Sequence, residues 1–484
     1  NAAPAAAEPA REIEVVPAGK AAAAIAALTT SRHAVPTSVA SVSFAAPETA
    51  APSTAPGPAP APAAVRIPAP LPDRVLAPPT GRSILRPEDA AEADFAEVEL
   101  YYGTDRAPSG QLRPATFYGG ARGEMDYGRV TVALPRGARP DGAEMPALYT
   151  FGWPENPDHH VVIADLDRLA PEAFFAGLRA RGAATGDDAI LLYVHGYDTS
   201  FAEAARRTAW MAYDAGFSGV PMFFSWPSVG APNGYVADAA AAQVSARRLV
   251  GFLEDLVARS EGAPIHLVAQ AMGGRALAQA LELYAAAHPE AEAVFGQVIL
   301  AAPDVDADLF ALQAHAIRRL ATRVTLYTNS AEAGLAAAGV FQGGVPRAGA
   351  GGIAAVSEAD FDMIDMSALG EDLLAHRANA AEPTAVADIA WLMWRDAGPG
   401  RRCGMSAPTG DAGAAWRYGA LDCDTGQLLP ALALLRRYGA EAPAHVAALR
   451  AASGAGAAAA DETASEATAE LDRLAATLDE LLTR

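Results

Sequence analysis

The chain has 484 residues and a formal net charge of −21, and its length alone allows two or three domains. The excess of negative charge repels phosphate backbones and anionic lipid, so we expect no nucleic-acid partner. No apolar run reaches the roughly 18 residues of a membrane-spanning helix. The run Ala21–Leu28 is too short, and no clear cleavage site follows it, so we expect neither a transmembrane segment nor a retained signal peptide.

The first part of the chain differs in composition from the rest. Residues 1–92 are dominated by Ala, Pro, Ser and Thr and contain few aromatic side chains, with closely spaced prolines between Pro58 and Pro72. A segment of this kind cannot bury a hydrophobic core. We therefore predict a disordered Ala/Pro-rich arm over residues 1–92.

Residues 93–400 have the pattern of one α/β domain. Strands are predicted at 98–102, 129–134, 160–165, 189–194, 220–226, 265–269, 297–302 and 324–327, and helices at 171–181, 201–215, 237–258, 274–287 and 307–320. From residue 189 onward, strands alternate with helices. This order predicts a mostly parallel central sheet with helices on both faces.

Residues 401–455 are a predicted C-terminal extension that contains both cysteines of the chain, Cys403 and Cys423. They flank a loop with Gly, Pro and Asp that would benefit from closure by a disulfide. A disulfide between them would place the protein outside the cytoplasm, in the periplasm or envelope of a bacterium. Two unrelated buried thiols are the alternative.

Residues 456–484 form a predicted amphipathic terminal helix. Leu471, Leu474, Leu478 and Leu481 are spaced three, four and three residues apart, which is a short heptad-like seam. Such a helix packs either on its own domain or on a partner.

The segment from Ile265 to Arg275 has the layout of a nucleophile elbow. An apolar strand run is followed at once by a tight turn of small residues and a helix-forming run. In such an elbow a strained strand-to-helix turn lifts a serine hydroxyl above the sheet, in the pattern small-x-Ser-x-Gly. Here the central position is Ala271. A methyl group cannot attack a carbonyl, so the sequence has the frame of a serine hydrolase without its nucleophile.

Further motifs occur around this segment in a fixed order. They are Tyr102–Arg106, Phe117–Gly120, Tyr127–Val132, Val194–Phe201, Phe224–Ser228 and Ala301–Asp308. With these motifs, residues 95 to about 395 resemble the bacterial esterase/lipase-like α/β-hydrolases of mostly unknown function. The resemblance implies the α/β-hydrolase fold and the order Ser-acid-His of catalytic residues along the chain.

Carried over residue by residue, the resemblance places the nucleophile at Ala271, the acid at Glu332 and the histidine at His376. It places the oxyanion-hole donors on the backbone N–H groups of Tyr197 and Met272. Neither a cofactor nor a metal is implied.

Several positions near the elbow depart from the pattern of the family. Gln270 stands where His is common, Asp198 where Asn is usual and Glu332 where Asp is usual. Asp238 is followed by four alanines, Ala239–Ala242, where relatives carry a polar cluster. So many departures indicate drift after catalysis was no longer selected. A single replacement of Ser by Ala at position 271, in an otherwise working enzyme, is the alternative.

Other polar residues in these motifs have structural interpretations. Ser225 and Ser228 are the nearest alternative hydroxyls, but they belong to a strand end and its loop. His195 is expected to shape the turn before Gly196. The acidic residues at 304, 306 and 308 lack the glycine and distal Glu of an EF-hand loop, so we expect a solvated helix N-terminus there.

The sequence therefore predicts a non-catalytic pseudohydrolase with a binding or structural role in the bacterial envelope. The first alternative is a serine esterase or lipase that acts on carboxylic esters, seen here as a Ser-to-Ala variant. The second is an accessory subunit of an envelope complex. The pseudohydrolase is expected to bind a protein partner or small ligand through the old pocket, the N-terminal arm or the C-terminal helix, and in the envelope complex the arm would run along neighbouring subunits.

Overall fold

The structure is a computed structural model of the whole chain, in which part of the chain is described. The described residues are 95–135, 161–332, 334–335, 338–339, 343–350, 361–370, 373–374, 385–408, 415–419, 431–432, 434–435, 438–456 and 462–483. The chain divides into the units Asn1–Arg74 and Val75–Arg484, and all described residues belong to the second unit. The arm predicted over residues 1–92 lies outside the described residues and stays a prediction.

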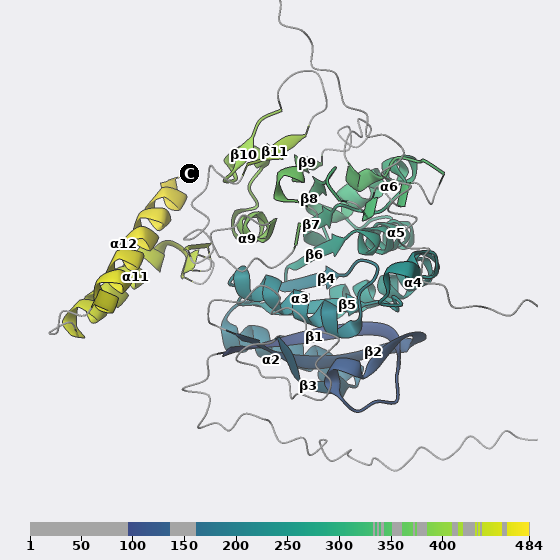
Figure 1. Cartoon of the computed structure of the whole chain (residues 1–484), viewed down its shortest axis with the longest axis horizontal. Coiled ribbons are helices and arrows are strands. Elements are labelled where there is room, and N and C mark those ends of the chain that lie inside the picture. The colour runs from purple at the N-terminus through teal and green to yellow at the C-terminus, as the bar shows by residue number, and fades with distance from the viewer. Residues whose placement is uncertain are drawn as a thin grey trace, which may run out of the picture. The chain divides into compact units, whose positions relative to one another are not determined.

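One 11-stranded sheet forms the centre of the described unit, with the order β10-β11-β9-β8-β7-β6-β4-β5-β1-β2-β3 (Figure 1). The strands are β1 Phe95–Pro108, β2 Tyr118–Pro135, β3 Val162–Leu169, β4 Ile190–Val194, β5 Val220–Ser225, β6 Ile265–Gln270, β7 Phe295–Ala301, β8 Ala321–Thr328, β9 Asp362–Asp365, β10 Met405–Ser406 and β11 Trp416–Tyr418. Neighbours are parallel from β1 through to β11, and antiparallel pairs occur only toward the two edges. The predicted mostly parallel sheet is confirmed.

Helices cover both faces of this sheet. They are α2 Pro171–Thr185, α3 Phe201–Asp214, α4 Tyr235–Arg259, α5 Met272–Ala287, α6 Ala307–Leu320 and α9 Ala385–Arg395, followed by α11 Ala442–Gly456 and α12 Glu462–Thr483. Short 3-10 turns lie between them at η1 Pro114–Thr116, η2 Pro232–Gly234, η3 Ala348–Ala350, η4 Ser367–Leu369, η5 Pro399–Arg401 and η7 Gly439–Glu441. Helices α3 and α9 contribute to one buried hydrophobic cluster, and α2, α4, α5 and α6 to the other.

The continuous apolar run of β4 has a direct structural reason. Ile190, Leu192 and Val194 belong to the cluster on one face of the sheet. Leu191 and Tyr193 belong to the cluster on the other face. A parallel strand with helices on both sides buries side chains of both orientations, so every position is apolar.

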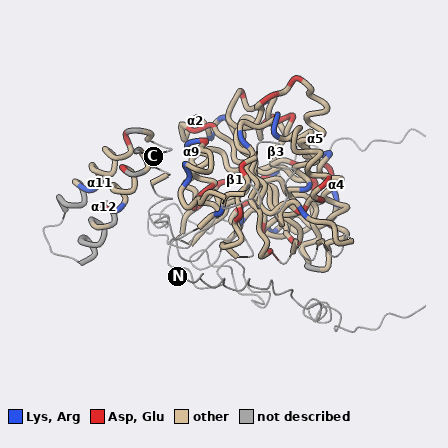
Figure 2. Tube along the Cα trace, turned by 90° about the horizontal axis from the view of Figure 1, so that it is seen from above, with Lys and Arg blue, Asp and Glu red and all other residues tan. Residues whose placement is uncertain are grey.

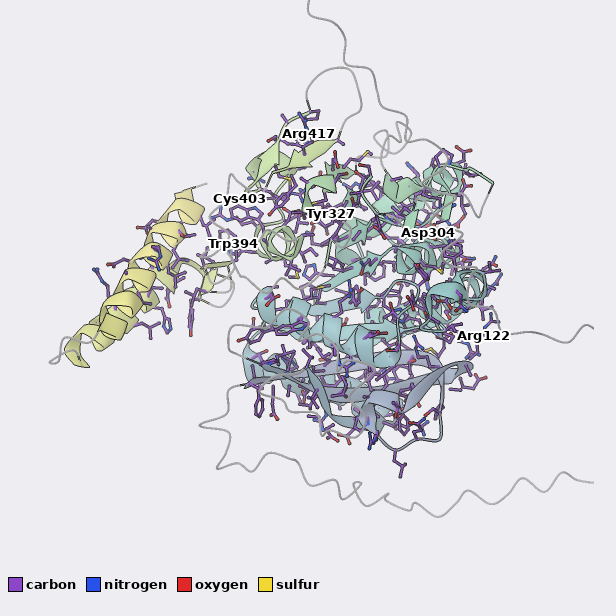
Figure 3. The ribbon with its side chains drawn as sticks, viewed as in Figure 1. Arg122, Asp304, Tyr327, Trp394, Cys403 and Arg417 are labelled. Carbon is purple, nitrogen blue, oxygen red and sulfur yellow. The ribbon has the colours of Figure 1, made fainter. Side chains whose placement is uncertain are left out.

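The sheet continues past residue 400, where the sequence suggested a domain boundary. Strand β11 pairs with β9 in parallel, and β10 pairs with β11. Just before β10, the fully buried Arg402 donates to Asp388 on α9 and to Asp362 on β9, each at 2.8 Å. Tyr327, labelled in Figure 3, donates its hydroxyl to the same Asp388 at 2.6 Å. Arg402 thus ties the start of this segment to the core through charged groups, and β10 and β11 extend the sheet.

The cysteine pair is only partly described. Cys403 is half-buried and packs against the hydrophobic core, and the described part of the chain contains no free cysteine. Cys423 lies outside the described residues. The Cys403–Cys423 disulfide therefore stays a prediction.

The terminal helix α12 packs within its own chain. The side chains of Leu474, Leu478 and Leu481 are buried in the same cluster as Val446 of α11. The leucine seam that the sequence offered to either its own domain or a partner is thus covered by the chain itself. None of the described helices has both the length and the hydropathy of a membrane span. Acidic and basic residues alternate along the described trace (Figure 2).

Replacing Arg402 by Met leaves the buried Asp388 carboxylate without a cation. Because an unpaired buried charge is strongly unfavourable, we expect the free energy of unfolding to fall by about 3–5 kcal/mol in urea titrations. Arg450→Met is the matched control, since Arg450 forms an exposed ion pair with Asp472 on α12 at 2.9 Å. That variant should lose less than about 1 kcal/mol. Equal losses in the two variants would contradict a stabilising role for the buried pair.

Candidate functional site

The backbone turn between β6 and α5 is strained at Ala271. This residue has φ 45° and ψ −116°, a conformation that a residue with a Cβ adopts only when its surroundings force it. Three hydrogen bonds hold it: the N–H of Ala271 donates to the carbonyl of Ala301 at 2.9 Å, and its carbonyl accepts from the N–H groups of Asp304 at 2.9 Å and Gly274 at 3.0 Å. The turn therefore has the strain that a nucleophile elbow requires.

Two glycines allow this turn to lie close to the neighbouring strand. A Cβ on Gly273 would collide with the backbone carbonyl oxygens of Val194 and His195. A Cβ on Gly196 would lie 3.4 Å from the methyl carbon of Ala271. The first turn of α5 and the loop after β4 thus meet backbone to backbone. This close approach explains why the position two residues after Ala271 is glycine.

The backbone N–H groups of Tyr197 and Met272 flank the elbow from two segments. Tyr197 lies in the loop after β4, and Met272 is the first residue of α5. Neither N–H donates a hydrogen bond to another described residue. The N-terminus of α5 adds the positive end of a helix dipole beside them. The role of these two N–H groups as oxyanion-hole donors stays a prediction.

Asp198, which replaces the usual Asn, has a positive φ of 54°. Asn and Asp are the side-chain-bearing residues that tolerate this region best, so this departure from the family pattern leaves the loop conformation intact. Its backbone N–H donates to the carboxylate of Asp238 at 3.2 Å.

Glu332, the predicted acid, lies shortly after the end of β8, and its charge acts on the hydroxyl of Tyr197. Both side chains lie near Gly334. A Cβ built on Gly334 would be 3.7 Å from the Oε1 of Glu332 and 4.0 Å from the Cε1 of Tyr197. Burial raises the pKa of the Tyr197 hydroxyl, and the charges of Asp198 and Glu332 raise it further. The structure thus brings Glu332 to the loop that flanks the elbow.

The predicted histidine, His376, lies outside the described residues. The described strand that precedes it is β9, which ends at Asp365 beside β8. The relation between His376 and Glu332 stays a prediction, as does the catalytic role of either residue.

His195 is a structural residue, as the sequence indicated. It is fully buried, and its ring stacks on Trp226 with the centroids 5.0 Å apart. Its Nδ1–H donates to the carbonyl of Gly196 at 2.7 Å, which leaves Nε2 as an acceptor. Burial lowers its pKa well below the usual value, and the charge of Arg106 lowers it further. The ring is therefore neutral and fixes the loop after β4.

The two alternative serine hydroxyls are already engaged and fully buried. Ser225 Oγ accepts from Arg106 at 2.8 Å and lies 3.2 Å from His195 Nε2. Ser228 Oγ donates to Asp238 at 2.6 Å. Neither hydroxyl is accessible to a substrate, so neither replaces the nucleophile missing at Ala271.

The acidic segment after β7 differs from the expectation. Asp306 does cap α6, because its carboxylate accepts from the N–H groups of Asp308 and Leu309. Asp304, labelled in Figure 3, is not solvated: it is 3% exposed. Its carboxylate accepts from Arg347 at 2.7 Å, Tyr235 at 2.7 Å and Arg275 at 3.1 Å. The sequence interpretation missed this, because the three donors come from segments far apart in the chain.

Gln270, which precedes Ala271 where His is common, is held by two donors. Its Oε1 accepts from the hydroxyl of Tyr193 and from the guanidinium of Arg207, each at 2.9 Å. Among the described residues no group of three or more His, Cys, Asp or Glu side chains is arranged to hold a metal ion.

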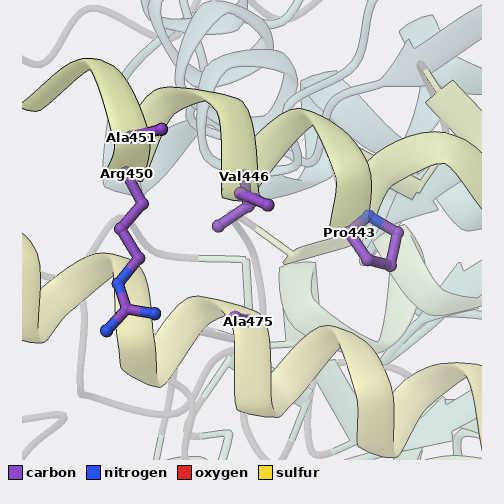
Figure 4. A pocket seen from close by; sticks show the side chains of 6 residues that line it. Pro443, Val446, Arg450, Ala451 and Ala475 are labelled. Atoms are coloured by element: carbon purple, nitrogen blue, oxygen red, sulfur yellow. The ribbon is translucent and has the colours of Figure 1, made fainter.

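A separate hollow of about 450 Å³ lies between α11 and α12 (Figure 4). It is lined by Pro443, Val446, Ala447, Arg450, Ala451 and Ala475. Its one charged lining residue, Arg450, is paired with Asp472. None of the residues that surround the elbow lines it, so it is no candidate active site.

The parallel sheet with helices on both faces, together with the strained turn after β6, defines the α/β-hydrolase fold, and the described domain has this fold. Residues 176–393 match the family model described as alpha/beta hydrolase of unknown function (DUF900), which supports an α/β-hydrolase family. No curated protein matches the chain. Among solved structures, the chain is similar to one titled "The structure of esterase Est22", with 12% identity, a TM-score of 0.18, and coverage of 45% of this chain and 47% of that chain. The chain thus spans about half of that structure.

The glycine at the elbow gives a stability test. Gly273→Ala forces a methyl group into the carbonyls of Val194 and His195, so we expect a loss of about 1–3 kcal/mol in the free energy of unfolding. Gly251→Ala on α4 is the control, because nothing lies within 4 Å of its added Cβ. That change should stabilise the protein by about 0.5–1 kcal/mol. A neutral Gly273→Ala variant in thermal and urea unfolding would refute the close backbone approach.

Asp105, near the end of β1, carries a buried carboxylate that is only partly satisfied. Its Oδ2 accepts from Ser245 at 2.7 Å, whereas its Oδ1 has no hydrogen-bond partner. Burial raises its pKa, against the opposing effects of Ser245 and Arg248. The folded state therefore binds this proton more tightly than the unfolded state does.

The sign of this effect predicts a pH dependence. As pH rises above the ordinary carboxyl pKa of about 4, the folded protein loses stability through Asp105 until its raised pKa is passed. Asp105→Asn removes this loss. We expect the variant to gain stability relative to the original protein between pH 4 and pH 7, measured by urea unfolding at each pH. A difference that stays constant or shrinks over this range would contradict the raised pKa.

Proposed function

We propose that this chain is a non-catalytic α/β-hydrolase-fold protein that binds a ligand or partner without acyl chemistry. One observation carries the proposal: the strained turn after β6 presents the methyl group of Ala271. Covalent acyl transfer begins with attack by an oxygen or sulfur at this point, and a methyl group supplies neither.

The surroundings of the elbow support the loss of catalysis. Gln270 is bonded to Tyr193 and Arg207, so its side chain is committed to these two groups. Ala241 and Ala242 on α4 are buried among apolar side chains, where the family resemblance implies a polar cluster. The hydroxyls of Ser225 and Ser228 are engaged in the loop. No single one of these features prevents catalysis. Together they fit a site on which selection for catalysis no longer acts.

We further propose a place in the bacterial envelope or periplasm, and a protein partner. The location rests on the predicted disulfide of Cys403. The leucine seam of α12 is not proposed as the partner surface, because it is covered within the chain. The N-terminal arm is the remaining proposed contact for an envelope complex.

A serine esterase acting on carboxylic esters is the second candidate, and it has its own supporting observation. The turn keeps the φ and ψ of an elbow, and the N–H groups of Tyr197 and Met272 have no described partner. If only the hydroxyl is missing, its return restores the enzyme.

Ala271→Ser decides between the two candidates. If the site has drifted, hydrolysis of short-chain p-nitrophenyl esters should rise less than about tenfold, since an isolated hydroxyl without a working acid and base gains little. The unchanged chain should not be labelled by a fluorophosphonate probe.

A gain on the order of 10⁴-fold or more would overturn the proposal and establish the esterase, because it would show that the rest of the machinery works. Gly251→Ser on α4 serves as the control for a new hydroxyl far from the elbow. Comparable gains in both variants would reveal a contaminating hydrolase.

A further inference from the structure

Arg106, near the end of β1, is a buried cation that donates to the start of β2, to the end of β5 and to the loops after β4 and β5. Arg106 is 1% exposed. Its five N–H groups donate to Ser225 Oγ at 2.8 Å, the carbonyls of Gly119 and Ser228 at 3.0 Å each, the carbonyl of Thr199 at 2.6 Å, and His195 Nε2 at 3.4 Å. None of these acceptors is a carboxylate. Burial lowers its pKa to about 10, so it stays charged at neutral pH.

Asp238, on α4, binds both the loop after β4 and the loop after β5. It is fully buried, and its Oδ2 accepts from Ser228 Oγ at 2.6 Å and from the backbone N–H of Asp198 at 3.2 Å. Its Oδ1 accepts from the N–H of Val229 at 2.7 Å. Ser228 therefore links the two charges, since its carbonyl accepts from Arg106 and its hydroxyl donates to Asp238.

We propose that Arg106, linked to Asp238 through Ser228, is the positioning residue for the loop His195–Ser200 and so for the Tyr197 N–H beside Ala271. The loop is anchored on both sides of Tyr197, at the ring of His195 and at the carbonyl of Thr199. The role rests on the proposed site at the elbow. This role requires no nucleophile, because Arg106 acts by fixing the direction of a backbone N–H.

The residue type fits this task. A guanidinium donates in five fixed directions, whereas an ammonium has three donors and is more strongly hydrated. A buried cation without a direct anionic partner is costly, so it persists where its hydrogen bonds organise the surrounding backbone. The same logic explains why Asp238 remains while the next four positions are alanines: its carboxylate is needed by the loop.

Amide hydrogen exchange on the full chain, with Ala271 in place, tests this role. In Arg106→Gln we expect amides of residues 195–200, above all those of Asp198 and Thr199, to exchange about tenfold faster or more. Arg106→Lys should give an intermediate rate. Amides of α6, which lies away from these loops, should keep their rates. Arg129→Gln is the matched control, because Arg129 on β2 bonds Glu99 and Asp167 at the surface.

Two results would overturn the proposal. One is an unchanged exchange rate in the loop of Arg106→Gln. The other is an equal acceleration in the loop and in α6, which would show that Arg106 supports the whole fold and not this loop. If Arg106→Gln does not fold, the comparison of Arg106→Lys with the original protein decides in the same way. Exchange does not depend on catalysis, so ester hydrolysis by Ala271→Ser would refute the proposed function and leave this test valid.

Discussion

The backbone constraint at Ala271 organises the carboxyl-terminal edge of the sheet. A residue with φ 45° and ψ −116° must be held by its neighbours. Here Ala301 and Asp304, from β7 and the loop after it, supply the hydrogen bonds. Gly273 lets α5 start against the carbonyls that end β4. Once this turn is fixed, the helix N-terminus, the loop after β4 and the segment after β8 have little freedom in where they lie.

A site can keep its frame after losing its chemistry, because the two depend on different atoms. The hydroxyl of a serine contributes to the reaction but not to the strained turn, so alanine at 271 leaves the turn in place. Arg106 and Asp238, in contrast, satisfy buried backbone and side-chain groups of the loops. Removing either would leave polar groups unpaired inside the protein. The molecule therefore retains the groups on which its fold depends.

The same distinction separates what was predictable from what was not. The strands and helices from residue 189 to 327 follow from apolar periodicity, and the structure has them in the predicted order. The elbow follows from a short local pattern. Asp304 was misread as solvated, because Arg275 and Arg347 reach it only in the folded state. Strand β11 was not anticipated, since three residues, Trp416–Tyr418, carry too little periodicity.

The sequence by itself determined the parallel sheet, the position of the sharp turn and the absence of an oxygen at its apex. These are local properties: they depend on side-chain periodicity within a segment and on the chemistry of one residue. Only the tertiary structure decided that Arg106 is bonded to the loops after β4 and β5, that the charge of Glu332 acts on Tyr197, and that the terminal leucines are covered. Each of these facts joins residues remote in the chain, and their proximity is set by how helices pack on the sheet.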